Sequence, residues 1–188
     1  RGLNVLVGES GSGKSSLLKV IARLLEPHTG QVLIDEQDVR NVSLESLRQD
    51  VVYVPQKSMV FEGTVRDNLL LASPHISDAE LVGVLGQTGC SFVFDLTEGL
   101  ETKLGQSTTP FSASQLQRLS LARALLRSPK ILLLDEPTSS LDSSNEKTML
   151  ETLQPIAQHV TVIMTTHRLI TIKAASQIVV LSKGSVVA

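Results

Sequence analysis

The sequence predicts an α/β fold in which a mostly parallel sheet is flanked by helices, with a helical lobe beside it. Short apolar runs alternate with segments of helical spacing, a pattern typical of parallel sheets covered on both faces. Residues 131–134 are apolar without polar alternation, as expected for a strand buried on both faces. Residues 64–128 are mostly helical in pattern, which predicts the lobe.

The first half of the predicted core is defined by apolar runs and by the residues that end them. "LNVLVG" predicts a buried strand that ends in glycine, and "KSSLLKVIARLLE" carries apolar residues at helical spacing up to Pro27. "GQVLID" predicts a second strand, and "SLESLRQ" a short helix with Ser43 and Ser46 at capping positions. "DVVYVPQ" predicts a third strand, closed by Pro55.

The lobe and the second half of the core follow. Residues 64–94 predict helices broken at Ser73-Pro74 and at Gly89, and residues 110–129 predict one helix that stops at a proline. "KILLLDEP" and "VTVIMTTH" predict strands on either side of the helix "SSNEKTMLETLQPIAQ". "QIVVLSKGSVVA" predicts a hairpin that turns at Lys183-Gly184. We expect one domain over residues 1–188, with a core at about 1–57 and 129–188 and the lobe at about 58–128.

Charge and cysteine content narrow the class of protein. The formal net charge of -2 argues against a nucleic-acid partner, because such proteins usually carry a basic stripe. We interpret Arg118, Arg123 and Arg127 as a solvated helix face. Cys90 is the only cysteine, which rules out an internal disulfide and favours a reducing compartment.

The apolar runs are shorter than the ~18 residues that a membrane helix needs, and no signal-peptide pattern opens the sequence. The sequence begins inside a predicted strand and ends on a strand-like stretch. We therefore expect it to be a piece of a longer polypeptide, truncated at its N-terminus.

A glycine-rich turn between the first strand and the first helix predicts a phosphate-binding loop. "GESGSGKS" has the spacing G-x-x-x-x-G-K-S in the strand–helix context that this motif requires. Its glycines let the backbone point successive N–H groups inward, Lys14 can reach the β- and γ-phosphates, and the Ser15 hydroxyl can ligate Mg²⁺. The predicted nucleotide-binding residues here are Gly8, Glu9, Ser10, Gly11, Ser12, Gly13, Lys14, Ser15 and Ser16.

Acidic and polar residues follow three of the predicted strands. Asp135 and Glu136 end a buried strand, where ligands of open α/β sheets bind. We expect Asp135 to hold Mg²⁺ and Glu136 to orient or deprotonate an attacking water. Gln56 is a neutral ligand suited to Mg²⁺ or the lytic water, and His167 ends a further strand at the same edge.

The start of the 110–129 helix has an unusual run of small residues. Ser112, Ala113 and Ser114 precede Gln115, and a helix start with free N–H groups and small side chains can receive an anion. Whether that anion is held by the same chain is not decided by this segment alone.

Taken in order, these motifs resemble those of an ATP-binding-cassette (ABC) ATPase over nearly the whole chain. Residues 8–15 resemble the family's Walker A loop, Gln56 its Q-loop, residues 111–115 its signature, Asp135-Glu136 its Walker B motif, residues 139–142 its D-loop and His167 its H-loop. The phrases "VPQKSMVFEGTVRDNL" and "TTHRLITI" are most similar to the nucleotide-binding domains of ABC exporters.

The resemblance implies a P-loop NTPase core and a helical lobe that carries the signature helix. It also implies ATP and Mg²⁺ as cofactors, and a membrane domain in the same or a partner polypeptide, so the chain is expected at the cytoplasmic face of a membrane. In the family two cassettes face head to tail, so Ser112, Gln115 and Asp142 are expected to meet the nucleotide bound by a second cassette. For Asp142 the alternative is a cap of the helix that starts near Ser143.

The signature departs from the family pattern L-S-G-G-Q. This chain has "FSASQ", with Ala113 and Ser114 in place of both glycines, and the added Cβ atoms limit close approach to phosphate and disfavour positive φ. "LGQSTTP" just upstream lacks the acidic segment that exporters often carry there. We interpret the chain as one half of a heterodimeric exporter with one strong and one weak ATP site. A homodimer that tolerates both substitutions is the alternative.

Two functions of other classes compete with an exporter ATPase. A soluble ABC-type ATPase acting on DNA or ribosomes would carry a long coiled-coil insertion or a second cassette, and residues 56–111 are too few for such an insertion. A nucleotide-gated binding module with little hydrolysis is suggested by the altered signature. Replacing Glu136 with glutamine separates that module from an ATPase.

Overall fold

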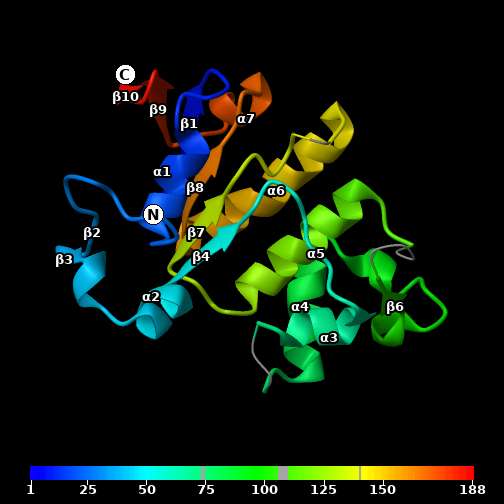
Figure 1. The fold of residues 1–188 in the computed structure, drawn as a ribbon. Coiled ribbons are helices and arrows are strands. Elements are labelled where there is room, and N and C mark those ends of the chain that lie inside the picture. The colour runs from blue at the N-terminus through cyan, green and yellow to red at the C-terminus, as the bar shows by residue number, and fades with distance from the viewer. Residues whose placement is uncertain (73–74, 106–109, 140) are drawn as a thin grey trace. The chain divides into compact units, whose positions relative to one another are not determined.

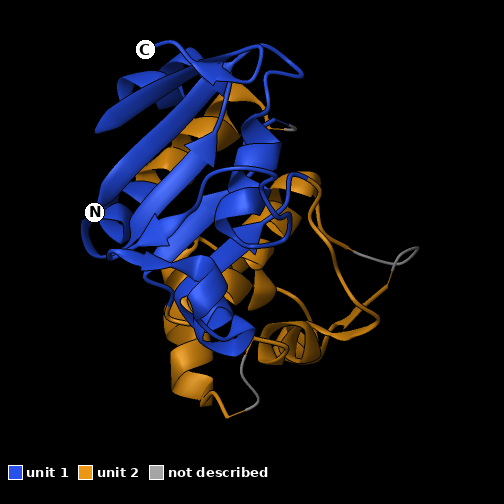
Figure 2. Cartoon of the chain, turned by 60° about the vertical axis from the view of Figure 1, so that its left-hand side comes forward, with its two compact units in different colours: residues 1–56, 129–139, 153–188 blue, residues 57–128, 140–152 orange. Residues whose placement is uncertain are grey.

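The computed structural model describes residues 1–72, 75–105, 110–139 and 141–188. The chain divides into two compact units, the first made of residues 1–56, 129–139 and 153–188 and the second of residues 57–128 and 140–152 (Figure 2). The predicted break at Ser73-Pro74 falls outside the described residues. In the described part of the chain, no helix is both long enough and apolar enough to cross a bilayer.

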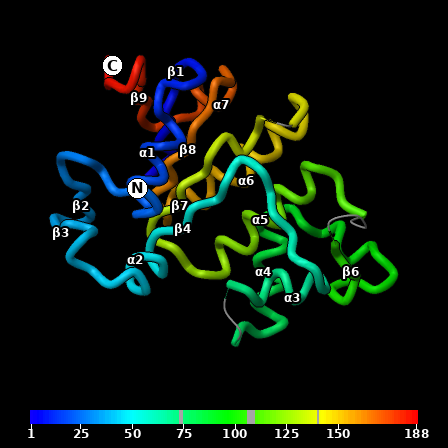
Figure 3. The backbone as a smooth tube through the Cα atoms, viewed as in Figure 1, coloured from blue at the N-terminus to red at the C-terminus, as the bar shows by residue number. Residues whose placement is uncertain are grey.

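The first unit is built on a six-stranded sheet with the order β10-β9-β1-β8-β7-β4 (Figure 1). Its strands are β1 (Gly2–Gly8), β4 (Val51–Val54), β7 (Ile131–Leu134), β8 (Thr161–Thr165), β9 (Gln177–Ser182) and β10 (Ser185–Val186). All pairs are parallel except β9 with β10, which confirms the mostly parallel sheet. Figure 3 traces how β1 and β8, far apart in the sequence, run side by side.

The register of this sheet aligns the carboxyl ends of its central strands. Val54 pairs with Leu134, Leu134 pairs with Met164, and Leu6 of β1 pairs with Thr165. The residues that follow β1, β4, β7 and β8 therefore emerge at one edge of the sheet, where open α/β sheets bind their ligands.

Helices cover both faces of the sheet. Leu18 of α1 (Lys14–Ile21) and Leu47 of α2 (Leu44–Asp50) are buried in one core cluster with Leu6 and Leu133. The last part of α6 (Ser143–His159) lies on the opposite side, where Ala157 lines a cavity with residues of β1. The unit also contains the hairpin of β2 (Leu33–Ile34) and β3 (Gln37–Asp38), the turn η1 (Val39–Asn41) and α7 (Leu169–Lys173).

The second unit is helical, with its own apolar core. Its helices are α3 (Val65–Leu70), α4 (Asp78–Gln87), α5 (Ala113–Leu125) and the first part of α6, with the turns η2 (Ser91–Val93) and η3 (Gly99–Glu101) and the hairpin of β5 (Gly63–Thr64) and β6 (Lys103–Leu104). Leu69, Leu85 and Leu119 are buried in one cluster. Thr64, Ser77 and Ser112 each close a capping box at the start of a helix, which satisfies two otherwise free donors per helix.

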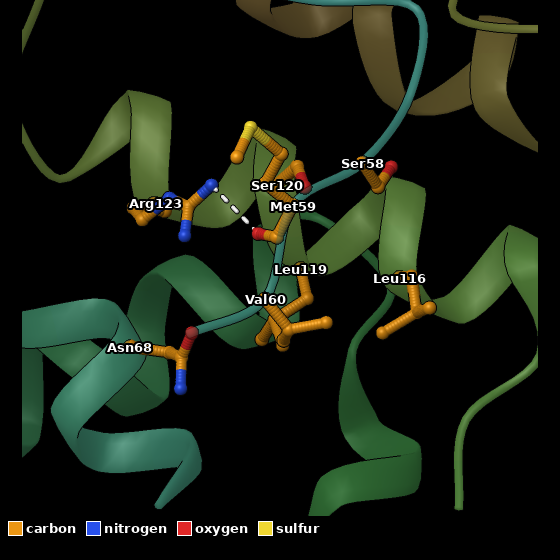
Figure 4. Close-up of a pocket in the computed structure, with 8 residues that line it drawn as sticks. All are labelled: Ser58, Met59, Val60, Asn68, Leu116, Leu119, Ser120 and Arg123. Atoms are coloured by element: carbon orange, nitrogen blue, oxygen red, sulfur yellow. Dashed lines mark hydrogen bonds between the residues drawn. The ribbon is translucent and has the colours of Figure 1, made fainter. Parts of the chain in front are cut away.

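A small cavity in this unit lies beside α5 and the segment before α3 (Figure 4). Arg123 Nη2 donates a hydrogen bond of 3.0 Å to the Met59 carbonyl at one side of the cavity. Its volume is about 10 Å³. A space of that size holds one water molecule at most, so the cavity is no ligand site.

Three predicted elements are shorter than expected, and one of them is the helix predicted over 110–129, which covers only Ala113–Leu125. The first helix ends at Ile21 because Arg23 has φ +51° and donates hydrogen bonds to the carbonyls of Val39 and Val42. The strand predicted over 30–35 covers only two residues, because Asp35 and Glu36 adopt positive φ and turn the chain into β3. The other predicted helices and strands that fall on described residues are confirmed, including the hairpin at Lys183-Gly184.

Candidate functional site

The glycine-rich loop joins β1 to α1 in the first unit. Gly8, Gly11 and Gly13 have φ of +156°, +79° and +100°, a region that side-chain-bearing residues rarely adopt. Gly8 also lies against backbone, because a Cβ at this position would come within 2.2 Å of the Leu181 carbonyl oxygen and 2.7 Å of Ser12 Oγ. The structure therefore gives a physical reason for glycine at both ends of the loop.

Gly8→Ala is expected to destabilise the first unit by about 1–3 kcal/mol beyond the cost of its φ, because the added methyl overlaps a backbone oxygen that cannot rotate away. Gly11→Ala is the matched control, since its φ is also positive but no atom lies within 4 Å of the position that its added methyl would take. Thermal unfolding of both variants checks this. Equal unfolding temperatures would contradict a steric role for Gly8.

The loop encloses polar groups that the chain itself leaves poorly satisfied. Lys14 is 7% exposed, and its Nζ donates to the carbonyls of Gly8 at 2.8 Å and Glu9 at 2.9 Å. No carboxylate forms an ion pair with it within the described ranges. Ser12 is 3% exposed, and its buried Oγ has no hydrogen-bond partner there. A buried ammonium without a counter-charge, beside an unsatisfied hydroxyl, suits an incoming anion.

The other residues of the loop are placed around this interior. Glu9, Ser10 and Gly11 are exposed at its tip, and Ser16 is exposed on the first turn of α1. The Gly184 N–H, in the turn between β9 and β10, donates to the Ser12 carbonyl at 3.1 Å. This hydrogen bond therefore attaches the β9–β10 turn to the buried part of the loop.

Asp135 follows β7 and is the hydrogen-bonding centre of the sheet edge. It is 5% exposed. Its Oδ1 accepts hydrogen bonds from Ser15 Oγ and from Thr165 Oγ1, both at 2.8 Å, and its Oδ2 accepts one from Tyr53 Oη at 2.9 Å. The structure thus brings together two of the three predicted metal ligands, Ser15 and Asp135.

The donor set at this position fits Mg²⁺. A serine hydroxyl and one carboxylate are hard oxygen ligands, and Mg²⁺ is commonly held by one or two carboxylates together with substrate phosphates. The described residues contain no cluster of three or more histidine, cysteine, aspartate or glutamate side chains that could hold a metal by themselves. A magnesium ion at Ser15 and Asp135 would therefore depend on further oxygens, such as those of a bound phosphate.

Glu136 has an unusual backbone conformation. Its φ is +43°, and its N–H donates to Thr165 Oγ1 at 2.8 Å. Positive φ in a residue with a side chain is held by surrounding contacts and is frequent at functional sites. Thr165 accepts from the Glu136 backbone and donates to Asp135, so one hydroxyl on β8 contacts the carboxylate of one acid and the main chain of the other.

The Gln56 side chain forms a hydrogen bond with the Glu136 carboxylate. Its Nε2 donates to Glu136 Oε2 at 3.0 Å and to Ser139 Oγ at 3.3 Å. The predicted role of Gln56 in orienting the lytic water fits this contact, whereas its predicted contact with Mg²⁺ stays a prediction. His167 is exposed two residues beyond β8, next to Thr166, whose N–H donates to the Leu6 carbonyl at 3.1 Å. It therefore emerges at the predicted edge.

The signature segment is an ordinary helix start in the second unit. Ser112 Oγ accepts from the Gln115 N–H at 3.2 Å, and Gln115 Oε1 accepts from the Ser112 N–H at 2.9 Å. Ala113 and Ser114 lie in α5 and do not adopt positive φ. Both positions are helical, so the positive φ that their Cβ atoms disfavour is not required here.

Ser114 forms a contact that glycine could not make. Its Oγ donates to Asn145 Oδ1 at 3.0 Å, and Arg118 Nη2 donates to the same oxygen at 3.3 Å. Asn145 in turn donates from its N–H to Asp142 Oδ1 at 2.8 Å and from its Nδ2 to Asp142 Oδ2 at 3.0 Å. Asp142 therefore caps α6, the alternative considered for it. Ser140 and residues 106–109, which belong to the predicted D-loop and to the segment before the signature, fall outside the described residues.

Three residues that take part in these hydrogen bonds were not predicted as site residues from the sequence, namely Thr165, Tyr53 and Asn145. Thr165 could have been found, because the predicted parallel strands end in step and place a threonine opposite Asp135. Tyr53 lies in the strand predicted before Pro55, where the sequence pattern indicates a core residue. Its ring packs against the core cluster, but its hydroxyl reaches Asp135. Burial, followed by the hydrogen bond to Asp135, raises the pKa of Tyr53 above its ordinary value, which keeps the hydroxyl protonated as a donor. No sequence pattern indicated a role for Asn145.

Known proteins are similar to this chain in sequence and in fold. The family model described as "ABC transporter" matches residues 2–139. The chain is 42% identical over 182 residues to the ABC-type transporter fsqE of Aspergillus fumigatus, covering 95% of this chain and 14% of that protein. It is 41% identical over 182 residues to an ATP-dependent lipid A-core flippase of Syntrophus aciditrophicus, covering 96% and 30%.

A solved structure of an ABC exporter is also similar to this chain. A bacterial Atm1-family ABC exporter with ATP bound matches all of this chain and 33% of its own, with a TM-score of 0.91 and 34% identity. The chain thus spans a third or less of the length of each of these three proteins.

Proposed function

The chain belongs to the ABC transporter family, and from that premise we propose that it binds Mg-ATP in the loop of residues 8–16 and hydrolyses it to drive export through a membrane domain. The observation that carries the proposal is the Ser15–Asp135 hydrogen bond of 2.8 Å, which joins the end of the glycine loop to the acid after β7. This hydrogen bond supports the proposal because it joins the glycine-rich turn to a carboxylate at the sheet edge.

The loop would hold the triphosphate. The inward N–H groups of residues 8–16 and the N-terminus of α1 supply partial positive charge, and Lys14 supplies a full one. We expect Lys14 Nζ to exchange its carbonyl partners for phosphate oxygens, because hydrogen bonds between charged groups are stronger than those to neutral ones. The Ser12 hydroxyl, without a partner in the described part of the chain, would donate to the same phosphates.

The acids and Gln56 would carry the chemistry. Ser15, Asp135 and Gln56 would hold Mg²⁺, which when bound neutralises charge on the phosphates. Glu136 accepts a proton from the attacking water, whose oxygen then forms the new bond to the γ-phosphorus as the bond to ADP breaks. Gln56 positions the Glu136 carboxylate through its 3.0 Å hydrogen bond, and His167 contributes a further polar contact to the water or the γ-phosphate.

The second cassette and the membrane domain are the proposed partners. Relatives of this chain are by name transporters, a flippase and export ATP-binding/permease proteins. We propose a head-to-tail dimer at the cytoplasmic face of a membrane, in which Ser112, Gln115 and Asp142 contact the nucleotide of the other cassette. The altered signature favours a heterodimer with one strong and one weak ATP site. The strong site would combine this chain's loop with a complete signature on the partner.

Restoring both glycines with Ala113→Gly and Ser114→Gly tests the heterodimer. We expect little change in overall ATP turnover, because this signature would serve the weak site. Ser114→Ala is the matched control, since it removes the hydrogen bond to Asn145 while keeping the Cβ. Turnover by the full-length protein is the measurement. A large rise in the double-glycine variant that the control does not show would indicate a homodimer instead.

The competing function in DNA or ribosome machinery finds less support. Between Gln56 and Phe111, the described residues form only short helices and a hairpin, of which α4 with 10 residues is the longest helix, so this part of the chain holds no coiled-coil insertion. The nucleotide-gated module would bind ATP with little hydrolysis.

Release of inorganic phosphate from ATP by the full-length protein, with and without Mg²⁺, tests the proposed activity. We expect Mg²⁺-dependent release that saturates with ATP. Tight ATP binding without such release would instead support the module.

A further inference from the structure

Tyr53 forms a hydrogen bond to Asp135 that the proposed mechanism does not use. Its Oη donates to Asp135 Oδ2 at 2.9 Å, whereas both other described donors, Ser15 and Thr165, bind Oδ1. The two oxygens of this carboxylate are therefore distinguished by their partners. Tyr53 alone among the described donors restrains the Oδ2 side.

The strand arrangement fixes where the Tyr53 hydroxyl lies. Tyr53 is on β4, the edge neighbour of β7, and pairs in register with Leu133, two residues before Asp135. Tyr53 packs against the buried cluster that contains Leu47 and Leu133, and this contact restrains its side chain. A tyrosine side chain is rigid and has few rotatable bonds, so its hydroxyl oxygen is fixed once the ring is packed.

We propose that Tyr53 is a positioning residue for metal binding: it holds the Asp135 carboxylate in the orientation that presents Oδ1, beside Ser15, to Mg²⁺. This rests on the proposed function, because the metal would be the one that accompanies ATP. The hydroxyl acts on the ligand and does not itself coordinate the ion. Hydrogen bonds that orient metal ligands in this way commonly contribute 10–100-fold to metal affinity.

Tyr53→Phe isolates the effect, because it keeps the ring and its packing and removes only the donor. We expect Mn²⁺, used as a spectroscopic substitute for Mg²⁺, to bind about 10-fold more weakly in the presence of a saturating non-hydrolysable ATP analogue. Binding of that analogue without metal is expected to be unchanged, because Tyr53 makes no described contact with the loop of residues 8–16. Electron paramagnetic resonance of free Mn²⁺ in the full-length protein measures the metal affinity.

Thr88→Val is the matched control for a general loss of stability. Thr88 is fully buried in the second unit, and its Oγ1 donates to the Val84 carbonyl at 2.8 Å, far from these acids in the chain. We expect it to lower the unfolding temperature without weakening Mn²⁺ binding. If Tyr53 were only a packing residue, Tyr53→Phe would behave like this control.

A second variant keeps the proposal testable if Tyr53→Phe changes stability as well. In an Asp135→Asn background, where the carboxylate is gone, adding Tyr53→Phe should cause no further loss of Mn²⁺ affinity. The proposal is overturned if Tyr53→Phe binds Mn²⁺ within about twofold of the wild type, or if its effect is the same in both backgrounds. Failure of the wild type to bind the ATP analogue at all would instead count against the proposed function.

Discussion

Replacing Glu136 with glutamine is expected to lower ATP turnover by about 10²–10⁴-fold while ATP binding is retained, because the amide cannot accept the proton of the attacking water. The substitution is nearly isosteric. In the wild type, Gln56 Nε2 donates a hydrogen bond to Glu136 Oε2. The glutamine side chain of the variant still offers an oxygen that can accept it. The Glu136 N–H bond to Thr165 is a backbone contact and is unaffected.

Single-turnover hydrolysis measures the chemical step of this variant apart from product release. Equilibrium binding of a fluorescent ATP analogue measures its affinity in parallel. Glu45→Gln is the control, since Glu45 is exposed on α2 and undergoes the same change of side chain away from the sheet edge. Hydrolysis that remains within a few-fold of the wild type would exclude Glu136 as the base and favour the nucleotide-gated module.

Removing the ammonium with Lys14→Ala is expected to weaken ATP binding by about 10–100-fold, since a charge-assisted hydrogen bond contributes about 1.5–3 kcal/mol. The loss has two sources. The phosphates lose their nearest full positive charge. The carbonyls of Gly8 and Glu9 lose the Lys14 ammonium that donates hydrogen bonds to both of them.

Lys19→Ala is the matched control, because Lys19 lies on the same helix but outside the loop. Isothermal titration with ATP, with and without Mg²⁺, measures both variants. We expect the control to bind ATP like the wild type. Equal affinities for Lys14→Ala and the wild type would show that the triphosphate does not lie in this loop.

The sequence predicts the elements around the candidate site because each motif is a local pattern. The glycine spacing of residues 8–15, the apolar strand before Asp135 and the hairpin at Lys183-Gly184 each depend on a few neighbouring residues, and the structure confirms the elements that they predict. The parallel register then follows from strands alternating with helices. It is this register that brings Ser15 and Thr165 to Asp135.

The features that the sequence analysis missed depend on contacts between distant segments. Arg23 ends α1 early by reaching carbonyls 16 and 19 residues away, and Tyr53 reaches Asp135 across 82 residues of sequence. The signature shows the same limit. In the sequence, serine in place of a signature glycine suggests a conflict with positive φ, whereas Ser114 is helical and donates to Asn145, 31 residues further on. No local pattern contains these partners.

The most direct measurement is the structure of the full-length protein with Mg²⁺ and a non-hydrolysable ATP analogue. Lys14 Nζ should leave the carbonyls of Gly8 and Glu9 and bind a phosphate oxygen, with Ser15 and Asp135 next to the metal and Glu136 facing the γ-phosphorus. An empty loop, or a Lys14 side chain still bonded to those two carbonyls while nucleotide occupies another place, would contradict the claim that this turn grips the triphosphate.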